Sequence, residues 1–508
     1  MEQKWGKAPA CWLWTALAAL WLAVFPLWQT GSYSCITRAK WESMLVLTAA
    51  SLVCALVFGA VCLARRQRAP FRLGLPQALA LMYFAWLGLS ACLGAYHGQL
   101  NADGQLAVWM GSKRYEGMAT QLCYCAIFLV MSLHPPRMDW LMRLAAAALV
   151  ALCAVVALQY AGLNPLGLFP AGLSTRTNYE FQGTIGNIDM VSGYLSLVIP
   201  LLLGGFVLTP RGDGLWLLAG LLGVLLEACM EVQSGFIALA VGAALLLALM
   251  LRRPACRCRG WITLCGASLC LVLRQAFALP WLDGVQQLGL AAPSGIMAAL
   301  LGVALACAGA AWFRHRHPGR ARMMWQVLLT ALLAAALVLA LVLLLPLDES
   351  FGGLWELREV LLGRGQDSFG SYRLGVWRHT LAMARENLLL GNGPDTFWFA
   401  FKAHLAKAGA TLPESFDNPH NEYLAILANA GLPALVIYLA LLGTTLLRCL
   451  RATPARRRTP PYALALMAAV LCYAAQGFFS FSICLVSPMF WAVMGMAAAW
   501  PMRRKGGR

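Results

Sequence analysis

The residues best suited to chemistry lie in the stretch DNPHNEYL at 417–424. Asn418 is a favourable helix N-cap and Pro419 suits the first helical position, so we expect a helix to start here with His420 in its first turn. The positive end of a helix disfavours a protonated imidazole, so His420 should stay neutral and able to accept a proton. A histidine that only forms a hydrogen bond at a helix start is the simpler alternative.

Two arginines precede this stretch, in a predicted amphipathic helix at 371–389. Arg373 and Arg378 would lie about one and a half turns apart, and guanidinium groups suit bidentate contact with phosphate. A solvated face or contact with lipid headgroups would also explain either arginine. Their proximity in the chain to the His420 helix start favours a phosphate site. The helical spacing predicts one apolar face, made of Leu374, Trp377, Leu381 and Ala384.

Three further ionisable residues, Glu227, Glu231 and Arg274, fall within or near apolar segments. Such groups are costly in lipid and suggest a functional site, although an internal ion pair or a helix end would also explain them. The sequence has no short Asp-x-Asp pair that would hold a metal for sugar-nucleotide chemistry. We therefore expect no metal and no other cofactor.

The elements that must position these residues are membrane-spanning helices. Of the 508 residues, 60% are hydrophobic and 12% are charged, about half the charged fraction of a soluble protein. About fourteen apolar segments have the roughly 17–25 residues needed to cross a bilayer. The predicted fold is an all-α, polytopic transmembrane bundle. The segments centre near residues 20, 53, 86, 125, 150, 198, 221, 242, 269, 303, 335, 435, 469 and 491.

The net charge of +18 is distributed by topology. If the N-terminus is cytoplasmic and the segments alternate, the inward loops hold 26 of the 39 Lys and Arg and three of the 21 acids. This positive-inside bias predicts a multi-pass membrane protein with both termini in the cytoplasm. The excess charge would meet anionic lipid headgroups, so we expect no nucleic-acid partner.

The chain divides into three predicted parts. Residues 1–347 form a transmembrane bundle of about eleven helices, and residues 419–508 form three C-terminal transmembrane helices. Between them, residues 348–418 form a long extracytoplasmic loop domain with short amphipathic helices. A second loop helix is predicted at 395–409, where phenylalanines favour a position at the membrane surface.

Three stretches, in this order, resemble the O-antigen ligase and polymerase superfamily. They read GTIGNIDMVSGYLSLVIPLL at 183–202, RLGVWRHTLAMARENLLLGNGPDTFWFAF at 373–401 and NPHNEYLAILANAGLPALVIYLALL at 418–442. The resemblance covers roughly residues 180–450. It implies a membrane-embedded glycosyltransferase of the C type in the cytoplasmic membrane of a bacterium. Such an enzyme moves a glycan from an undecaprenyl-diphosphate carrier to an acceptor hydroxyl, with inversion and without a metal.

The resemblance also implies roles for individual residues. His420 matches the family's loop histidine and would activate the acceptor, while Arg373 matches the loop arginine that contacts the diphosphate. Arg378 lies close by, and Asn421 belongs to the His-Asn-x-x-Leu motif, so both are further candidates for substrate binding.

The chain departs from the family pattern before the Gly-Thr-x-Gly-Asn stretch, where many members have an arginine. Glu180 and Gln182 occupy that region, and Arg176 is the nearest candidate for a second phosphate ligand.

Several functions remain open at this point. A ligase would pass the glycan to a lipid, a wall polymer or a protein, whereas a polymerase would pass it to another carrier-linked glycan. A transporter or flippase of lipid-linked glycan would predict repeated halves and charges near the midplane, and neither pattern is visible. The expected partners are the carrier-linked donor, the acceptor and the lipid bilayer.

Overall fold

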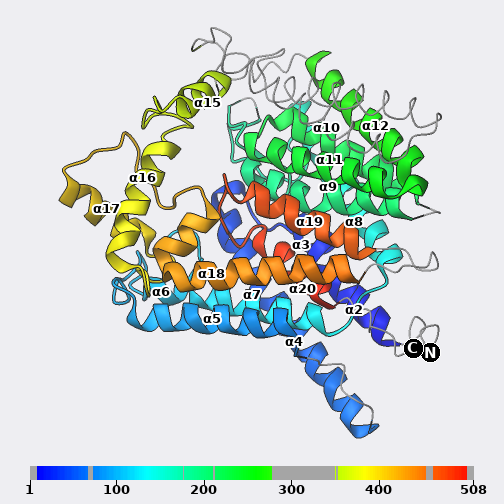
Figure 1. The fold of residues 1–508 in the computed structure, drawn as a ribbon, viewed down its shortest axis with the longest axis horizontal. Coiled ribbons are helices and arrows are strands. Elements are labelled where there is room, and N and C mark those ends of the chain that lie inside the picture. The colour runs from blue at the N-terminus through cyan, green and yellow to red at the C-terminus, as the bar shows by residue number, and fades with distance from the viewer. Residues whose placement is uncertain are drawn as a thin grey trace.

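The fold is a bundle of α-helices, with a β-hairpin as its one small sheet among the described residues (Figure 1). The computed structural model describes residues 9–66, 73–175, 177–209, 212–276, 349, 353–452 and 462–499. Eight helical stretches in these ranges are long and apolar enough to cross a membrane, and four shorter apolar helices accompany them. The all-α polytopic prediction is therefore confirmed.

Twelve of the fourteen predicted segments coincide with helices. The predicted segments centred near 303 and 335 lie outside the described residues, as does Arg176. The long helical stretches are α2 (Pro9–Ala19) with η1 (Leu20–Val24) and α3 (Phe25–Leu27), α4 (Ile36–Ala64), α5 (Leu75–Leu93), α8 (Met138–Tyr160), α9 (Ile188–Leu208), α11 (Gln233–Arg252), α12 (Arg257–Ala276) and α18 (Glu422–Arg451). The shorter ones are α7 (Met118–Leu133), α10 (Gly214–Met230), α19 (Tyr462–Gln476) and α20 (Ser487–Ala499).

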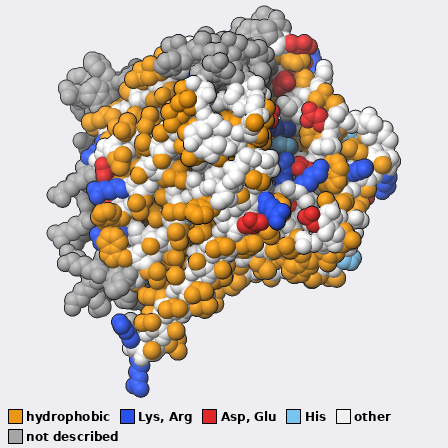
Figure 2. Space-filling model, turned by 180° about the vertical axis from the view of Figure 1, so that it is seen from behind, with side chains coloured by type: hydrophobic (Ala, Val, Ile, Leu, Met, Phe, Trp, Pro, Cys, Tyr) orange, Lys and Arg blue, Asp and Glu red, His pale blue; other side chains and the backbone are white. Residues whose placement is uncertain are grey.

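The contrast between α9 and α4 shows how the bundle meets its solvent. Most of α9 is buried, because it packs against α10, α11 and α19. By contrast, α4 exposes Val46, Leu56 and Leu63 to 68%, 71% and 73%. An apolar helix face left exposed at this scale is suited to lipid. Figure 2 shows the same division, with a mainly hydrophobic flank and charged side chains gathered around a hollow at one end.

The Gly-Thr-x-Gly-Asn stretch forms a tight hairpin that starts α9. Strands β1 (Phe181–Gln182) and β2 (Gly186–Asn187) pair antiparallel. Gly186 has φ +104°, a conformation that favours glycine. The Thr184 hydroxyl donates to the Pro26 carbonyl at 2.8 Å, and Asn187 caps α9 by accepting from the Asp189 N–H at 2.9 Å. The hairpin thereby fixes Asp189 at one end of the bundle.

The predicted loop domain, residues 348–418, contains four short helices in its described part: α15 (Gly353–Leu361), α16 (Arg373–Ala384), η5 (Arg385–Asn387) and α17 (Phe397–Ala408). They lie at the end of the bundle where α18 begins (Figure 1). The predicted helix at 371–389 is shorter than expected, and its predicted apolar face is only partly right, since Ala384 is buried but Leu381 is not. Leu381 is 43% exposed, whereas Val376 and Met383 are buried. The reason is tertiary, because these side chains pack against α17 and α18.

The predicted second loop helix exists as α17, but its aromatic face is turned inward. Phe397 and Phe401 are both 2% exposed and stack with ring centroids 4.9 Å apart. They form a small core with Val376 and Phe416, so α16 and α17 are held together as one packed unit.

Candidate active site

His420 lies in the turn that leads into α18, and the predicted capping is wrong in register. The helix begins at Glu422, because Asn421 is the N-cap and accepts a hydrogen bond from the Leu424 N–H at 3.0 Å. Asn418 instead accepts from the His420 N–H at 2.9 Å, which forms a local turn. His420 adopts φ +48°, a left-handed conformation that is rare for a residue with a side chain. The backbone therefore holds His420 just outside the helix.

The ring of His420 lies in an aromatic setting. The Phe481 ring stands perpendicular to it at a centroid distance of 5.2 Å, and the Phe416 ring lies at 6.5 Å. Its Nδ1 atom is buried and has no hydrogen-bond partner among the described residues. The Trp377 indole donates to the carbonyl of Pro419, the preceding residue, at 2.8 Å. Helix α16 thus contacts the histidine turn directly.

His420 is held in its neutral form. Burial lowers its pKa to about 4, and the positive charges of Arg373 and Arg114 act in the same direction, while Asp417 opposes them. The neutral imidazole is confirmed as the favoured state, but for a different reason from the one predicted. Desolvation and two guanidinium groups lower the pKa of His420, which lies just before the first turn of α18 and not inside it.

Arg373 is the first residue of α16 and is half-buried. Within the described part of the chain, its guanidinium makes no hydrogen bond or ion pair. Burial lowers its pKa, and the carboxylate of Asp189 partly offsets that effect. A cation removed from water without a paired anion is energetically unfavourable, so this position favours an incoming negative charge.

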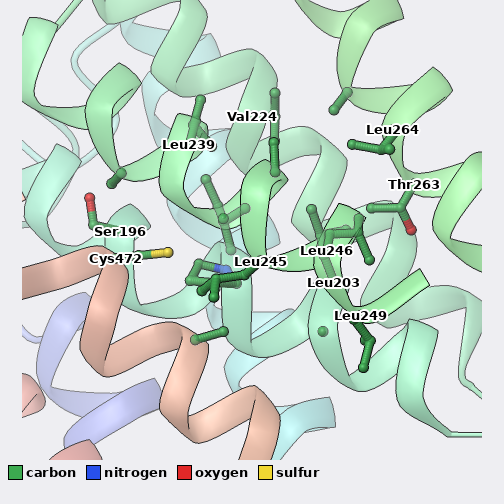
Figure 3. A pocket seen from close by; sticks show the side chains of 18 of the residues that line it. Ser196, Leu203, Val224, Leu239, Leu245, Leu246, Leu249, Thr263, Leu264 and Cys472 are labelled. Atoms are coloured by element: carbon green, nitrogen blue, oxygen red, sulfur yellow. The ribbon is translucent and has the colours of Figure 1, made fainter. Parts of the chain in front are cut away.

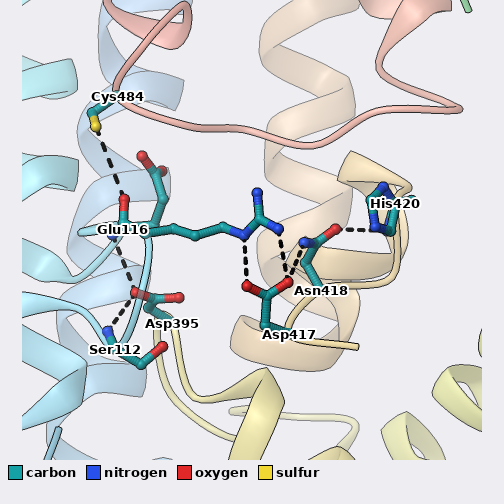
Figure 4. Close-up of polar contacts among 8 residues, drawn as sticks. Ser112, Glu116, Asp395, Asp417, Asn418, His420 and Cys484 are labelled. Carbon is teal, nitrogen blue, oxygen red and sulfur yellow. Dashed lines mark hydrogen bonds and ion pairs between the residues drawn. The ribbon is translucent and has the colours of Figure 1, made fainter. Parts of the chain in front are cut away.

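Arg114 reaches the same place from the loop between α6 (Ala107–Met110) and α7. Its Nε and Nη2 atoms donate to the two carboxylate oxygens of Asp417 at 2.8 and 2.9 Å (Figure 4). Its guanidinium carbon lies 4.2 Å from the centroid of the Phe481 ring. Burial alone would raise the pKa of Asp417, but Arg114 holds it below its ordinary value.

The loop that carries Arg114 is fixed by Asp395. The Asp395 carboxylate accepts from the backbone N–H groups of Ser112 at 2.7 Å and Glu116 at 3.2 Å (Figure 4). Burial raises the pKa of Asp395 to about 6 and that of Glu116 to about 8. Both line a cavity of about 90 Å³ beside Asp417. Asp395, the last residue of the GNGPD stretch at 391–395, therefore holds the backbone of the loop that carries Arg114.

The other predicted site residues lie elsewhere. Arg378 is exposed, and it forms an ion pair with Asp367 at 2.6 Å and a hydrogen bond to the Gly365 carbonyl at 2.9 Å. The side chain of Asn421 is used as the helix cap. The structure therefore brings His420 and Arg373 together, leaves Arg378 outside, and adds Arg114.

Sequence reasoning missed Arg114, although a signal was present. Lys113 and Arg114 are adjacent basic residues in a loop predicted to face outward, where the charge bias disfavours them. The Lys113 amine lies 4.3 Å from the centroid of the Trp398 ring, and Arg114 pairs with Asp417, so both side chains of this basic pair contact the loop region that holds α17 and His420.

A larger, mainly apolar cavity of about 500 Å³ lies within the bundle, between α9, α10, α11, α12 and α19. Ser196 from α9 and Cys472 from α19 line one side, and leucine is the commonest residue type in the rest of the lining (Figure 3). Its lining is suited to hydrocarbon.

Of the three ionisable residues predicted in apolar segments, Arg274 and Glu231 form an ion pair and Glu227 is hydrogen-bonded. Arg274 lies 3.7 Å from Glu231, and both side chains are almost fully buried. Glu227 accepts a hydrogen bond from the Ser192 hydroxyl at 2.9 Å. The internal ion pair therefore describes Arg274 and Glu231, and Glu231 also lies at a helix end, as the C-cap of α10.

No curated protein matches the chain. The family model described as O-antigen ligase matches residues 285–439, a range that includes Arg373, Asp417 and His420. The match contains the loop helices and the start of α18, which form most of the site. This stretch of the multi-pass membrane protein therefore matches the O-antigen ligase family, which supports a place for the protein in the O-antigen ligase and polymerase superfamily of cell-surface glycan biosynthesis.

Proposed function

We propose that this protein transfers a glycan from an undecaprenyl-diphosphate carrier to an acceptor hydroxyl on the outer face of the cytoplasmic membrane. One observation carries the proposal. Arg373 is a half-buried cation without a partner among the described residues, and it is close enough to His420 to lower the pKa of that histidine. A desolvated guanidinium favours phosphate oxygens, and a neutral imidazole accepts protons.

In the proposed reaction, the acceptor oxygen attacks the anomeric carbon and forms the new glycosidic bond. The bond from that carbon to the diphosphate oxygen breaks, and the diphosphate leaves with the bonding electrons. The proton of the acceptor hydroxyl passes to His420, while Arg373 stabilises the charge that develops on the leaving group. A single displacement of this kind inverts the configuration at the anomeric carbon.

Donor binding would also make His420 a stronger base. In the free protein, burial and two arginines hold its pKa at about 4, where it is a weak base. The negative charges of a bound diphosphate oppose these arginines and raise the pKa towards its ordinary value. Proton acceptance therefore becomes more favourable when the donor is in place.

The apolar cavity supports a lipid-linked donor. Asp189 lies in the first turn of α9 near Arg373, and Ser196 lines the cavity further along the same helix. At 1.5 Å per residue, the two positions are about 10 Å apart along the helix axis. A polyprenyl chain in the cavity is therefore compatible with a diphosphate at Arg373.

Asn421 and Arg378 have secondary roles in this proposal. Asn421 supports the histidine turn through its cap on α18. Arg378 remains outside the diphosphate contact, because its guanidinium already pairs with Asp367.

The test is transfer by the purified protein in lipid nanodiscs, supplied with undecaprenyl-diphosphate-linked glycan and an acceptor. We expect His420→Gln to lower kcat by about 10²–10⁴-fold, because it removes the base. His97→Gln is the matched control, since His97 is an exposed outer-loop histidine. Undiminished transfer by His420→Gln would refute the mechanism. The product class, extended carrier-linked glycan or glycan on another acceptor, separates a polymerase from a ligase.

A further inference from the structure

We propose that Arg114 is a second ligand for the donor diphosphate, and that Asp417 serves as its counter-ion until the donor binds. The inference rests on the proposed function of the same site. It assigns a role to a pair of residues that meet across 303 positions of sequence.

The ion pair leaves Arg114 able to bind a second anion. Asp417 uses the Nε and Nη2 atoms of the guanidinium, and the Nη1 atom has no hydrogen-bond partner among the described residues. The Arg114 side chain is 29% exposed and that of Asp417 is 19% exposed, so the pair lies at an accessible boundary. The guanidinium carbon lies 4.2 Å from the centroid of the Phe481 ring, and the Nη1 donor is available for phosphate oxygens.

Arg114 and Arg373 act on the same two groups. Both lower the pKa of His420, and both interact electrostatically with Asp189. They come from different elements, the α6–α7 loop and α16, which approach His420 separately. A diphosphate esterified at both ends carries two negative charges, which two guanidinium groups would balance.

The Arg114 loop is built to hold a fixed position. Asp395 accepts two backbone N–H groups of this loop, from Ser112 and Glu116. A binding group fixed in this way loses little conformational freedom when its ligand arrives. An arginine needed only to neutralise Asp417 would not require Asp395 to hold the backbone on both sides of it.

Exchange of the counter-ion at Arg114 would also raise the pKa of His420. Asn418 donates to a carboxylate oxygen of Asp417 at 2.8 Å and accepts from the His420 N–H at 2.9 Å. When a phosphate replaces Asp417 at Arg114, the carboxylate charge stays beside the histidine turn. Both the released carboxylate and the bound phosphate then favour protonation of His420.

The experiment measures binding of undecaprenyl diphosphate, without a glycan, to the full-length protein in nanodiscs. We expect Arg114→Gln to weaken binding by about ten- to a hundredfold, because a hydrogen-bonded charge contact is lost. Asp417→Asn should tighten binding several-fold, because it removes the competing carboxylate. Arg114→Gln/Asp417→Asn should bind as weakly as Arg114→Gln. Arg385→Gln, at an exposed loop arginine, is the matched control and should bind like the wild type.

The double variant separates ligand binding from a structural role. If Arg114 only neutralises Asp417, then removing both charges restores wild-type affinity, and the inference is overturned. Asp417→Asn is expected to bind undecaprenyl diphosphate more tightly, a result that a misfolded variant could not produce. If Asp417→Asn binds no more tightly than the wild type, the inference is also overturned. Equal binding by the wild type and Arg114→Gln overturns the inference alone. No binding by the wild type overturns the proposed function as well.

Discussion

The buried charges of the bundle and those of the candidate active site around His420 differ in whether an opposite charge is paired with them. Arg274 and Glu231 lie 3.7 Å apart among apolar helices, and both are almost fully buried. Arg373 is also removed from water, but no anion forms an ion pair with it in the described chain, and the Asp189 carboxylate interacts with it only electrostatically. Paired charges serve the fold, whereas an unpaired cation beside a neutral base is available for a ligand.

The same difference predicts opposite responses to mutation. A residue in a closed pair should affect stability more than activity, because its partner is left buried and uncompensated. A residue with an open charge should affect activity more than stability, because the folded protein gains little from it before the ligand binds. Arg274 and Glu231 represent the closed pair, and Arg373 represents the open charge.

The largest effect on stability is expected at the bundle pair. Arg274→Gln removes the guanidinium that lies 3.7 Å from the buried Glu231 carboxylate, which should cost about 3–5 kcal/mol in the free energy of unfolding. Denaturation of the purified protein by SDS titration measures this change. The double variant Arg274→Gln/Glu231→Gln should recover much of the loss. If the single variant unfolds like the wild type, the pair does not stabilise the bundle.

The largest effect on catalysis without a stability cost is expected at Arg373. Arg373→Gln removes the stabilisation of the leaving diphosphate and should lower kcat/KM by about 10²–10³-fold. The free energy of unfolding should stay the same or rise slightly, since an uncompensated buried cation is removed. Steady-state transfer assays and SDS titration of the same preparation report both quantities. A variant that loses stability in step with activity would place Arg373 with the structural charges instead.

The bundle was largely predictable from sequence, because hydropathy over about twenty residues is a local property. The positions of α9 and α18 follow from their composition alone. The register at the start of α18 was not predictable, because Asn418 and Asn421 are both good caps, and the choice depends on the turn that holds His420.

The site was only half predictable for a physical reason. Arg373 and His420 are close in sequence, so their motifs indicate a shared region. The contact of Arg114 with Asp417 joins residues 303 positions apart, and no local pattern determines such a contact. The buried face of α16 was likewise set by its packing partners, because Val376 and Met383 are buried only once α17 and α18 lie against them.

The pH dependence of transfer is a smaller effect that isolates His420. Its pKa is lowered from the ordinary value of 6.5 to about 4, so the neutral base persists in the free protein until the pH falls to about 4. The acid limb of kcat/KM should therefore lie near pH 4, and the limb of kcat should lie higher, because the bound diphosphate raises the pKa. In Arg373→Gln the kcat/KM limb should move up towards pH 6.5, since a nearby positive charge is lost. Coincident limbs near pH 6.5 in the wild type would show that His420 is not held neutral.

The smallest effect is expected at Arg378, five residues after Arg373 on the same helix. Arg378 and Asp367 are 55% and 51% exposed, and an ion pair of this kind contributes little in water. Arg378→Gln should therefore change kcat/KM by less than about threefold, within the range of a surface pair. Measurement beside Arg373→Gln compares two arginines of one helix that differ in burial and pairing. A loss at Arg378 as large as that at Arg373 would mean that its pairing with Asp367 opens when the donor binds, and that position along α16, rather than the absence of a counter-ion, marks the phosphate ligands.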